Sequence, residues 1–443
     1  MVTSQRDPIP WVIALFIANF LLQRLSIPGI SIPLTVPFAV LWLTAALYFR
    51  VVALNQRRFT LWLVAGAASA LVVIPQLFWV QAPFISVNSW AFWMVVWLPV
   101  VVHLRDRSEA QFQRCLKAVS QFGLALSALS LTFIAVQLLG VPYRDVLADV
   151  IPSNFLVQGY VVSYPVLYGS PIYKSNGWIA LEPSFLSFML GVCIVGAILI
   201  KAHPLKVLFL LAGMFVTTAG SGFAVVVTAV IGLIVTNRWV LVKSYVPAAV
   251  GIAALALLTP FGQSIFGRLT EAGDDQSSTA LRSVEPYRYL WPQWINDPAG
   301  VFFGRGPGSS RWVIDNNGIP GLLTPNVPKV LFDYGLIAGA LLLALMLVTY
   351  IRTPEPVLAW ALGLSMFTLQ AASQPLVMCS IVVLTLWSPH RLQGTRTATS
   401  ADAATTATSG AEPWGAAQYG GRTPRQQVGA VSAGSEEHQW RRQ

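Results

Sequence analysis

Charged side chains are scarce in this chain. Asp, Glu, Lys and Arg make up 10% of its 443 residues, whereas 55% are hydrophobic. Soluble domains carry roughly 25% charged residues, so this composition argues against a water-soluble fold. The net charge of +10 would suit nucleic acid, but the positive residues flank apolar segments. We therefore expect a membrane protein that binds no nucleic acid.

Cysteine and histidine are also rare, and their positions argue against two kinds of site. The three cysteines, Cys115, Cys193 and Cys379, fall in or beside expected helices, which predicts no disulfide framework. The four histidines show no zinc-ligand spacing with cysteine. Asp274 and Asp275 are adjacent acids that could bind a divalent ion, although two neighbouring acids in a loop are usually only solvated. We expect neither a metal nor a cofactor.

Long apolar runs, in contrast, are abundant. A helix needs roughly 20 apolar residues to cross the hydrocarbon core, where unpaired backbone groups cost several kcal/mol each. The runs predict an all-α fold, a polytopic bundle of about twelve transmembrane helices within residues 1–388. Gly220-Ser221-Gly222, between the seventh and eighth, is either a break in one element or a tight hairpin. The expected spans are 10–24, 34–49, 60–80, 87–104, 118–140, 181–200, 207–219, 223–236, 245–261, 330–351, 356–370 and 374–388.

Lys and Arg occur in alternate short loops, for example between Arg50 and Arg58 and between Arg105 and Lys117. Cytoplasmic connections retain positive charge, so both termini are expected in the cytoplasm. Two long connections, 141–180 and 262–328, then lie outside, and short helices are expected in the second. Beyond Pro389 the chain turns to Thr, Ala, Ser and Gly, which predicts a disordered cytoplasmic tail, 389–443.

The first polar cluster precedes the sixth expected span. Lys174 and Asn176, which we expect to bind substrate, stand in Lys174-Ser175-Asn176-Gly177-Trp178, and Leu181-Glu182-Pro183-Ser184 follows. Pro183 suits the first turn of a helix, so Glu182 lies at the helix mouth. The helix dipole alone favours a carboxylate there. Because an ionisable group at membrane depth is costly unless it is used, Glu182 is equally a candidate general base or sugar ligand.

Five arginines lie among six acids in the connection 262–328: Arg268, Arg282, Arg288, Arg305 and Arg311. Ordinary salt bridges, such as Arg282 with Glu285, are the simplest explanation for each. Arginine's planar fork also suits phosphate oxygens, so we select Arg282 and Arg288 first and Arg305 next as phosphate ligands. The Tyr and Trp rings around them predict a short interfacial helix, kinked at Pro292.

Two further patterns follow in the chain. Gly304-Arg305-Gly306-Pro307-Gly308 permits a tight turn whose N–H groups, including those of Gly304 and Gly306, could face an anion. No strand precedes it, so a plain turn is the simpler interpretation. Lys329 and Asp333 are four residues apart and share one face of a helix. They either neutralise each other, or hold a pyrophosphate, or help to deprotonate a hydroxyl.

These elements, in this order, resemble the Wzy-type polysaccharide polymerase and O-antigen ligase superfamily of bacterial membrane glycosyltransferases. The resemblance covers roughly residues 175–340 in detail and the remainder only as hydropathy. The matching pieces are Asn176-Gly177, Glu182-Pro183-Ser184, Gly220-Ser221-Gly222, Arg282 and Arg288 ahead of Gly304-Arg305-Gly306-Pro307-Gly308, Asn326, Lys329, and Asp333-Tyr334-Gly335-Leu336-Ile337-Ala338-Gly339.

The resemblance implies a GT-C-like, multi-pass enzyme of the bacterial inner membrane. Such an enzyme polymerises sugar units carried on undecaprenyl pyrophosphate at the outer face, in contact with membrane lipid and without nucleotide sugar or metal. It implies that Arg282, Arg288 and Arg305 hold the carrier pyrophosphate, while a base, for which we nominate Glu182, activates the acceptor hydroxyl. A chain-length regulator and a flippase of the same pathway would be its partners.

Three alternatives stay open. Ligases of this superfamily place a histidine where this chain has Pro325, so the resemblance favours a polymerase over an O-antigen-ligase-like transferase. A transporter or flippase for a lipid-linked or anionic solute would hold its substrate near the midplane and show paired inverted repeats. Here the charges concentrate in loops and no repeat is evident. A non-catalytic scaffold of a polysaccharide assembly system is the third.

Overall fold

The computed structural model describes residues 7–29, 32–158, 160–167, 169–258, 284–316, 322, 324–351, 353–369 and 374–387. They belong to one compact unit, Met1–Pro389. The candidate Arg282 lies outside the described residues, as do Arg268, the Asp274-Asp275 pair and the expected tail 389–443.

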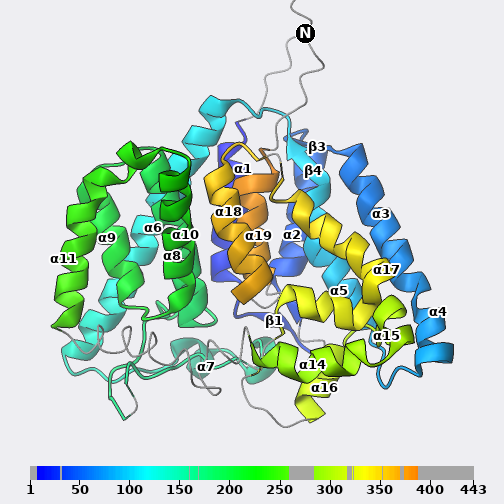
Figure 1. Ribbon diagram of the computed structural model, residues 1–443. Coiled ribbons are helices and arrows are strands. Elements are labelled where there is room, and N and C mark those ends of the chain that lie inside the picture. The colour runs from blue at the N-terminus through cyan, green and yellow to red at the C-terminus, as the bar shows by residue number, and fades with distance from the viewer. Residues whose placement is uncertain are drawn as a thin grey trace, which may run out of the picture. The chain divides into compact units, whose positions relative to one another are not determined.

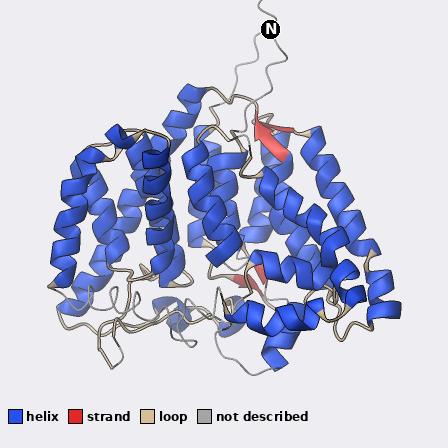
Figure 2. Ribbon diagram, viewed as in Figure 1, coloured by secondary structure: helices blue, strands red, loops and turns tan. Residues whose placement is uncertain are grey.

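Helices dominate this unit (Figures 1 and 2). The α-helices are α1 (Ile9–Leu21), α2 (Thr35–Tyr48), α3 (Gln56–Leu71), α4 (Val73–Pro75), α5 (Val87–Trp97), α6 (Glu109–Leu138), α7 (Val146–Val150), α8 (Pro183–Leu199), α9 (Pro204–Phe215), α10 (Gly220–Val235), α11 (Val246–Leu257), α14 (Glu285–Ile295), α15 (Pro298–Phe303), α16 (Ser309–Asn316), α17 (Asn326–Val348), α18 (Pro356–Leu364) and α19 (Gln374–Ser380).

Short elements of other kinds lie between them. The π-helical turns are η1 (Gln76–Val80), η7 (Ser365–Leu369) and η8 (Ile381–Thr385). The 3-10 turns are η2 (Leu98–Val101), η3 (Ser153–Phe155), η4 (Trp239–Leu241) and η5 (Lys243–Tyr245). Two antiparallel ribbons pair β1 (Ser26–Ile27) with β2 (Ile32–Pro33), and β3 (Val52–Leu54) with β4 (Val102–Leu104).

Helices occur in all of the expected spans, but most are short, and in the span 374–388 the α-helix α19 has 7 residues. Among the described residues, three helices are long and apolar enough to cross a membrane: Gln56–Val80, Glu109–Leu138 and Asn326–Val348. The other apolar helices have 10–17 residues. The expectation of one helix over 87–104 is wrong at its C-terminal end. Helix α5 ends at Trp97, and the chain continues as η2 and strand β4. Pro99 lies in η2, and proline interrupts helical hydrogen bonding.

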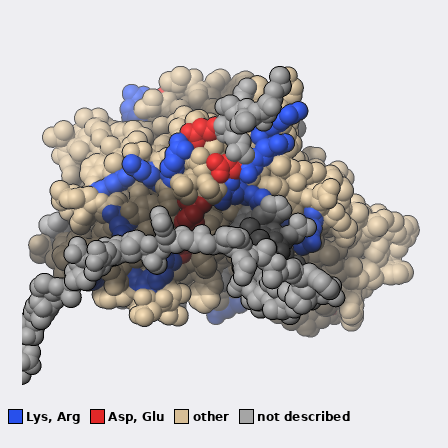
Figure 3. All heavy atoms as spheres, turned by 90° about the horizontal axis from the view of Figure 1, so that it is seen from above, with Lys and Arg blue, Asp and Glu red and all other residues tan. Residues whose placement is uncertain are grey.

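The two ends of the unit differ in character. Figure 1 places β3 and β4 at one end, here the ribbon end, and α7, α14, α15 and α16 at the other, here the loop face. The β3–β4 ribbon pairs Val52 with Leu104, which brings two arginine-bearing loops together. Figure 3 shows Lys and Arg side chains spread across the ribbon end, with some Asp and Glu among them.

Helix α8 is the centre of a group formed with α6, α9 and α10. Its side chains are apolar on every side and almost all are buried, which is typical of a helix enclosed by others. Glycines allow the close approach: a Cβ on Gly191 would lie 2.8 Å from the carbonyl oxygen of Gly222 in α10. Residues 216–219 separate α9 from α10, so Gly220-Ser221-Gly222 opens a new helix.

Candidate functional site

Glu182 is the N-cap residue of α8 and is only 4% exposed. Its backbone is extended, and Pro183 begins the helix, as the sequence predicts. The Ser184 hydroxyl donates to the Glu182 carboxylate at 2.9 Å, and the carboxylate makes no capping bond to the described backbone of α8. A buried carboxylate is costly without strong compensation. Simple helix capping therefore does not account for this residue.

The loop before Glu182 is held by its own polar groups. Asn176 is fully buried; its Nδ2 donates to the Val162 carbonyl at 3.1 Å, and its Oδ1 accepts from the Trp178 N–H at 2.9 Å. Both polar atoms of this side chain thus bond within the loop. Asn176 therefore helps to hold the loop, and its role in substrate binding stays a prediction. Lys174 is half-buried, and its N–H donates to the Tyr164 carbonyl at 2.7 Å.

A buried charge pair that sequence reasoning missed attaches this loop to the end of α1. Both terminal nitrogens of Arg24 donate to Asp145, at 2.8 and 2.5 Å, and Arg24 is 3% exposed. Arg24 also donates to the Trp178 carbonyl at 3.2 Å, and Gln23 accepts from the Leu181 N–H at 3.2 Å. The available signal was an arginine directly after an apolar helix, but nothing in the sequence names its partner.

Helix α14 carries Arg288 on the loop face. Leu290 and Trp294 are buried in a cluster with Phe332 of α17, so this side of α14 is fixed. Arg288 bonds Glu285 at 2.9 Å, yet its side chain remains 57% exposed. The expected helix therefore exists, with Pro292 inside it, and within the described residues Glu285 pairs with Arg288.

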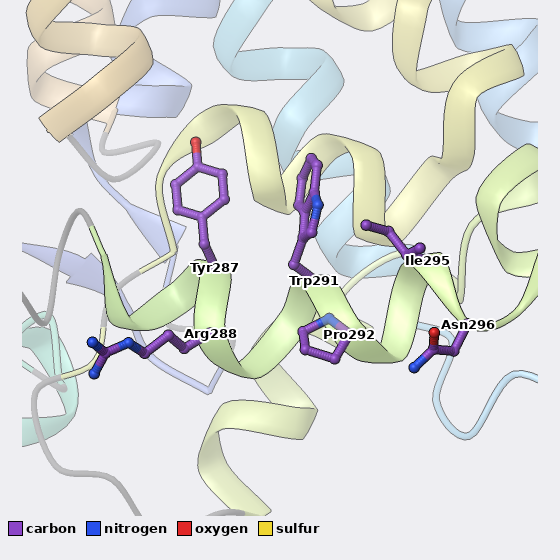
Figure 4. A pocket seen from close by; sticks show the side chains of 6 residues that line it. All are labelled: Tyr287, Arg288, Trp291, Pro292, Ile295 and Asn296. Carbon is purple, nitrogen blue, oxygen red and sulfur yellow. The ribbon is translucent and has the colours of Figure 1, made fainter.

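A groove of about 600 Å³ runs along α14. Figure 4 shows Tyr287, Trp291 and Ile295 on one side of the helix and Arg288 on another. Pro292 and Asn296 complete the lining. Burial raises the pKa of Tyr287, so its hydroxyl stays protonated at neutral pH and can donate a hydrogen bond. The groove thus combines apolar rings, a cation and a neutral donor.

The glycine-rich turn crosses α17 at van der Waals contact. Gly304 has φ +78°, and Gly335, with φ +65° and ψ −171°, kinks α17 at the same place. A Cβ on Gly304 would lie 2.5 Å from the Asp333 carbonyl oxygen and the Tyr334 nitrogen. Only glycine fits on both of the segments that cross here. We call this contact the glycine crossing.

The amides of the turn bond to the protein. The N–H of Gly304 donates to Gly300, that of Arg305 to Phe332 and that of Gly306 to Asp333, at 2.8, 2.8 and 3.0 Å. The expectation that Gly304 and Gly306 direct their amides at an anion is therefore corrected. These glycines fix the backbone on both sides of Arg305.

Asp333 is fully buried and collects donors from the turn. Its carboxylate accepts from the N–H groups of Gly308 and Ser310 at 3.1 and 2.8 Å, and from Lys329 at 3.0 Å. It therefore caps α16 and neutralises Lys329, which shares its helix face as predicted. A buried carboxylate with these partners holds structure, while the Lys329 side chain remains 20% exposed.

Arg305 reaches out from the glycine crossing. One terminal nitrogen bonds Asp297 at 3.2 Å, and the side chain is 24% exposed. Its Nε–H is buried and has no acceptor among the residues that the structure describes. A guanidinium with an unused donor is suited to take an anionic ligand.

Some of the candidate site residues thus contact one another in the structure, and the others lie elsewhere. Gly304, Arg305, Gly306, Lys329 and Asp333 form one network at the glycine crossing. Arg288 lies on α14, which packs against the same helix, α17. Lys174, Asn176 and Glu182 form a second group around the start of α8. Compared with known proteins, the chain matches no protein-family model and no curated protein sequence.

Proposed function

We propose that this chain is a multi-pass glycosyltransferase of the bacterial inner membrane. It would polymerise oligosaccharide repeat units carried on undecaprenyl pyrophosphate into a surface polysaccharide or exopolysaccharide. One observation carries the proposal. Two partly exposed cations belong to the loop-face segments: Arg288 lines the aromatic groove on α14, and Arg305 lies between α15 and α16.

The topology follows from charge. With the ribbon end in the cytoplasm, the positive-inside trend is obeyed, both termini are cytoplasmic, and the loop face lies outside. About twelve apolar helices would then cross the membrane. Helices of 10–17 residues are short for a bilayer, and such mismatch is relieved by local thinning and by flanking residues that reach the interface.

The reaction needs a base, a leaving-group site and two sugars. The acceptor hydroxyl attacks the anomeric carbon of the donor sugar, a glycosidic bond forms, and the bond to the carrier pyrophosphate breaks. Glu182 takes the hydroxyl proton, and the undecaprenyl pyrophosphate leaves with its electron pair. Arg288 and Arg305, joined by Arg282 on the strength of the motif resemblance, stabilise the charge that develops on this leaving group.

The groove along α14 suits the remaining parts of the substrate. Tyr287 and Trp291 offer flat apolar surfaces for sugar rings or for the start of a lipid chain. Arg288 lies at the same groove, so a headgroup phosphate and an apolar neighbour can be held together. A flippase of the same pathway would deliver this substrate, and a chain-length regulator would limit the product.

Exchange of Arg288 tests the proposal in the native host. Arg288→Ala and Arg282→Ala should shorten or abolish the surface polysaccharide, because each removes a charge from the leaving-group site. We expect transfer to fall by about 10²-fold. Electrophoretic sizing of the polysaccharide, together with membrane protein levels, provides the measurement.

Arg311→Ala is the matched control, because Arg311 also lies on the loop face, pairs with Asp315 at 2.9 Å and is equally exposed, at 57%. It should leave chain length unchanged. Wild-type polysaccharide from a normally inserted Arg288→Ala protein would contradict the proposal. Purified protein in liposomes separates the runner-up function: substrate that crosses the bilayer without new glycosidic bonds would indicate a transporter.

A further inference from the structure

The helical segment after α3 and α4 departs from regular geometry at one glutamine. The π-helical turn η1 (Gln76–Val80) follows Pro75, and the next residue, Gln81, lies in the left-handed region, with φ +54°. The Ala82 N–H closes the turn on the Gln76 carbonyl at 3.0 Å. Such turns are frequent at functional sites. Here the turn begins at Gln76.

Gln76 donates hydrogen bonds to both segments of the glycine crossing. Its Nε2 donates to the Phe303 carbonyl at 2.6 Å and to the Asp333 carbonyl at 3.0 Å. Phe303 precedes Gly304, and Asp333 lies two residues before Gly335. One amide group thus holds the turn and α17 together, from a helix distant in sequence. The Trp79 ring, 5.4 Å from that of Phe303, packs beside it.

These bonds fix the backbone that carries Arg305. The Arg305 N–H is held by Phe332, and the Gly306 N–H shares the Asp333 carbonyl with Gln76. Phe303 directly precedes Gly304, and Gln76 is the one side chain among the described residues that bonds its carbonyl. The direction in which Arg305 leaves the crossing therefore depends on Gln76.

Stability alone does not explain a glutamine at this position. Gln76 is fully buried, and its Oε1 receives no hydrogen bond within the part of the chain that the structure describes. A buried acceptor left unsatisfied costs free energy, and an apolar side chain of similar shape would avoid that cost. We therefore attribute the glutamine to the two hydrogen bonds that its Nε2 donates.

We propose that Gln76 is a positioning residue that aims Arg305 at the carrier pyrophosphate. The inference rests on the proposed glycosyl transfer and adds to it a residue outside both polar groups. Without the Nε2 donor, the turn stays packed through its glycines, but the Arg305 guanidinium is no longer held at one place. A misplaced guanidinium stabilises the charge on the leaving group less, so transfer slows.

A double-mutant cycle on the full-length protein in liposomes tests this. The assay measures KM and kcat for a lipid-linked repeat unit in wild type, Gln76→Leu, Arg305→Ala and the double variant. Gln76→Leu should lower kcat/KM about tenfold. In the Arg305→Ala background the same substitution should change kcat/KM by less than about twofold, because its effect passes through Arg305.

Gln137→Leu is the matched control. Gln137 also donates to two carbonyls, those of Phe133 and Tyr173, at 3.2 and 3.3 Å, but it lies at the end of α6. Any effect of its loss should be the same with and without Arg305. An equally constant effect of Gln76→Leu would overturn the positioning role while glycosyl transfer stands. A wild-type protein that forms no glycosidic bond would overturn both.

Gln76→Glu provides a second readout if the leucine variant does not fold. A protonated carboxyl group can still donate to the Phe303 carbonyl, but a carboxylate cannot and would repel it. Burial raises the pKa of such a group. The kcat/KM of Gln76→Glu relative to wild type should therefore fall as the pH rises through that pKa. A ratio to wild type that does not change with pH would refute the inference.

Discussion

Glu182 and Asp333 show how two buried carboxylates in one protein differ in use. Asp333 receives two backbone N–H groups and the Lys329 ammonium, so its lone pairs serve the fold. Glu182 accepts a hydroxyl from the neighbouring Ser184 and makes no capping bond to the described backbone of α8. Glu182 therefore does not cap its helix as Asp333 caps α16.

Glu182→Gln should lower kcat by about 10²-fold and leave KM nearly unchanged, since glutamine keeps the shape and the bond from Ser184 but cannot serve as a base. Initial rates with reconstituted protein provide the measurement. Glu355→Gln is a close control, because Glu355 also precedes a helix-initiating proline and is nearly buried. It pairs with Arg238 at 2.7 Å, so stability should fall while kcat persists. Equal kcat for wild type and Glu182→Gln would eliminate Glu182 as the base.

Local pattern predicts some of these residues and cannot predict others. Lys329 and Asp333 were expected on one helix face, and their ion pair confirms it. The donors from Gly308 and Ser310 come from 25 and 23 residues away, so they depend on how the turn docks on α17. Gln76 and Arg24 bind partners more distant still, and no spacing in the sequence links them.

At the scale of elements, backbone contact sets the geometry. The turn, α15 and the kinked start of α17 meet at Gly304 and Gly335, and α14 and α16 pack against the same helix. The sequence indicated the turn from its glycines and the start of α8 from Glu182-Pro183. It did not indicate where helices lose regularity, because the π-turns and the kink at Gly335 arise from packing.

Gly335→Ala should destabilise the protein by more than about 1–3 kcal/mol, the cost of holding a side chain in this region of backbone space. The added Cβ would also clash with the Phe302 carbonyl. Thermal unfolding in detergent, followed by the loss of helical signal, measures the change. Gly251→Ala tests the assay, because Gly251 lies in α11 with open space around its Cα and alanine favours helix. An unfolding temperature for Gly335→Ala that equals wild type would disprove the crossing.

At the scale of the whole molecule, composition indicated a helical membrane protein, and the structure agrees that helices long and apolar enough to span are present. Charge in the loops predicts which end faces the cytoplasm; Figure 3 shows Lys and Arg across the ribbon end, and the sidedness stays a prediction. The lengths of individual helices could not be predicted from the sequence. Hydropathy does not show where a proline ends a helix, as at Pro99.

Sidedness is testable with single cysteines. The native Cys115, Cys193 and Cys379 are buried and should not react. A membrane-impermeant maleimide added to intact spheroplasts should label Asn296→Cys, which is exposed on α14. Lys243→Cys, exposed after α10, should react only after permeabilisation. Labelling in the reverse order would place the groove in the cytosol, where no extracytoplasmic transfer can occur.

The attachment of α1 to the loop before α8 also has a consequence for biosynthesis. Arg24 is synthesised 121 residues before Asp145. Until Asp145 is made, the Arg24 side chain has to remain in water or among lipid headgroups. Only when residues 178 and 181 have followed can Arg24 and Gln23 find their last partners. The loop that leads to Glu182 is thus completed late, and the first segment inserted sets the place where it docks.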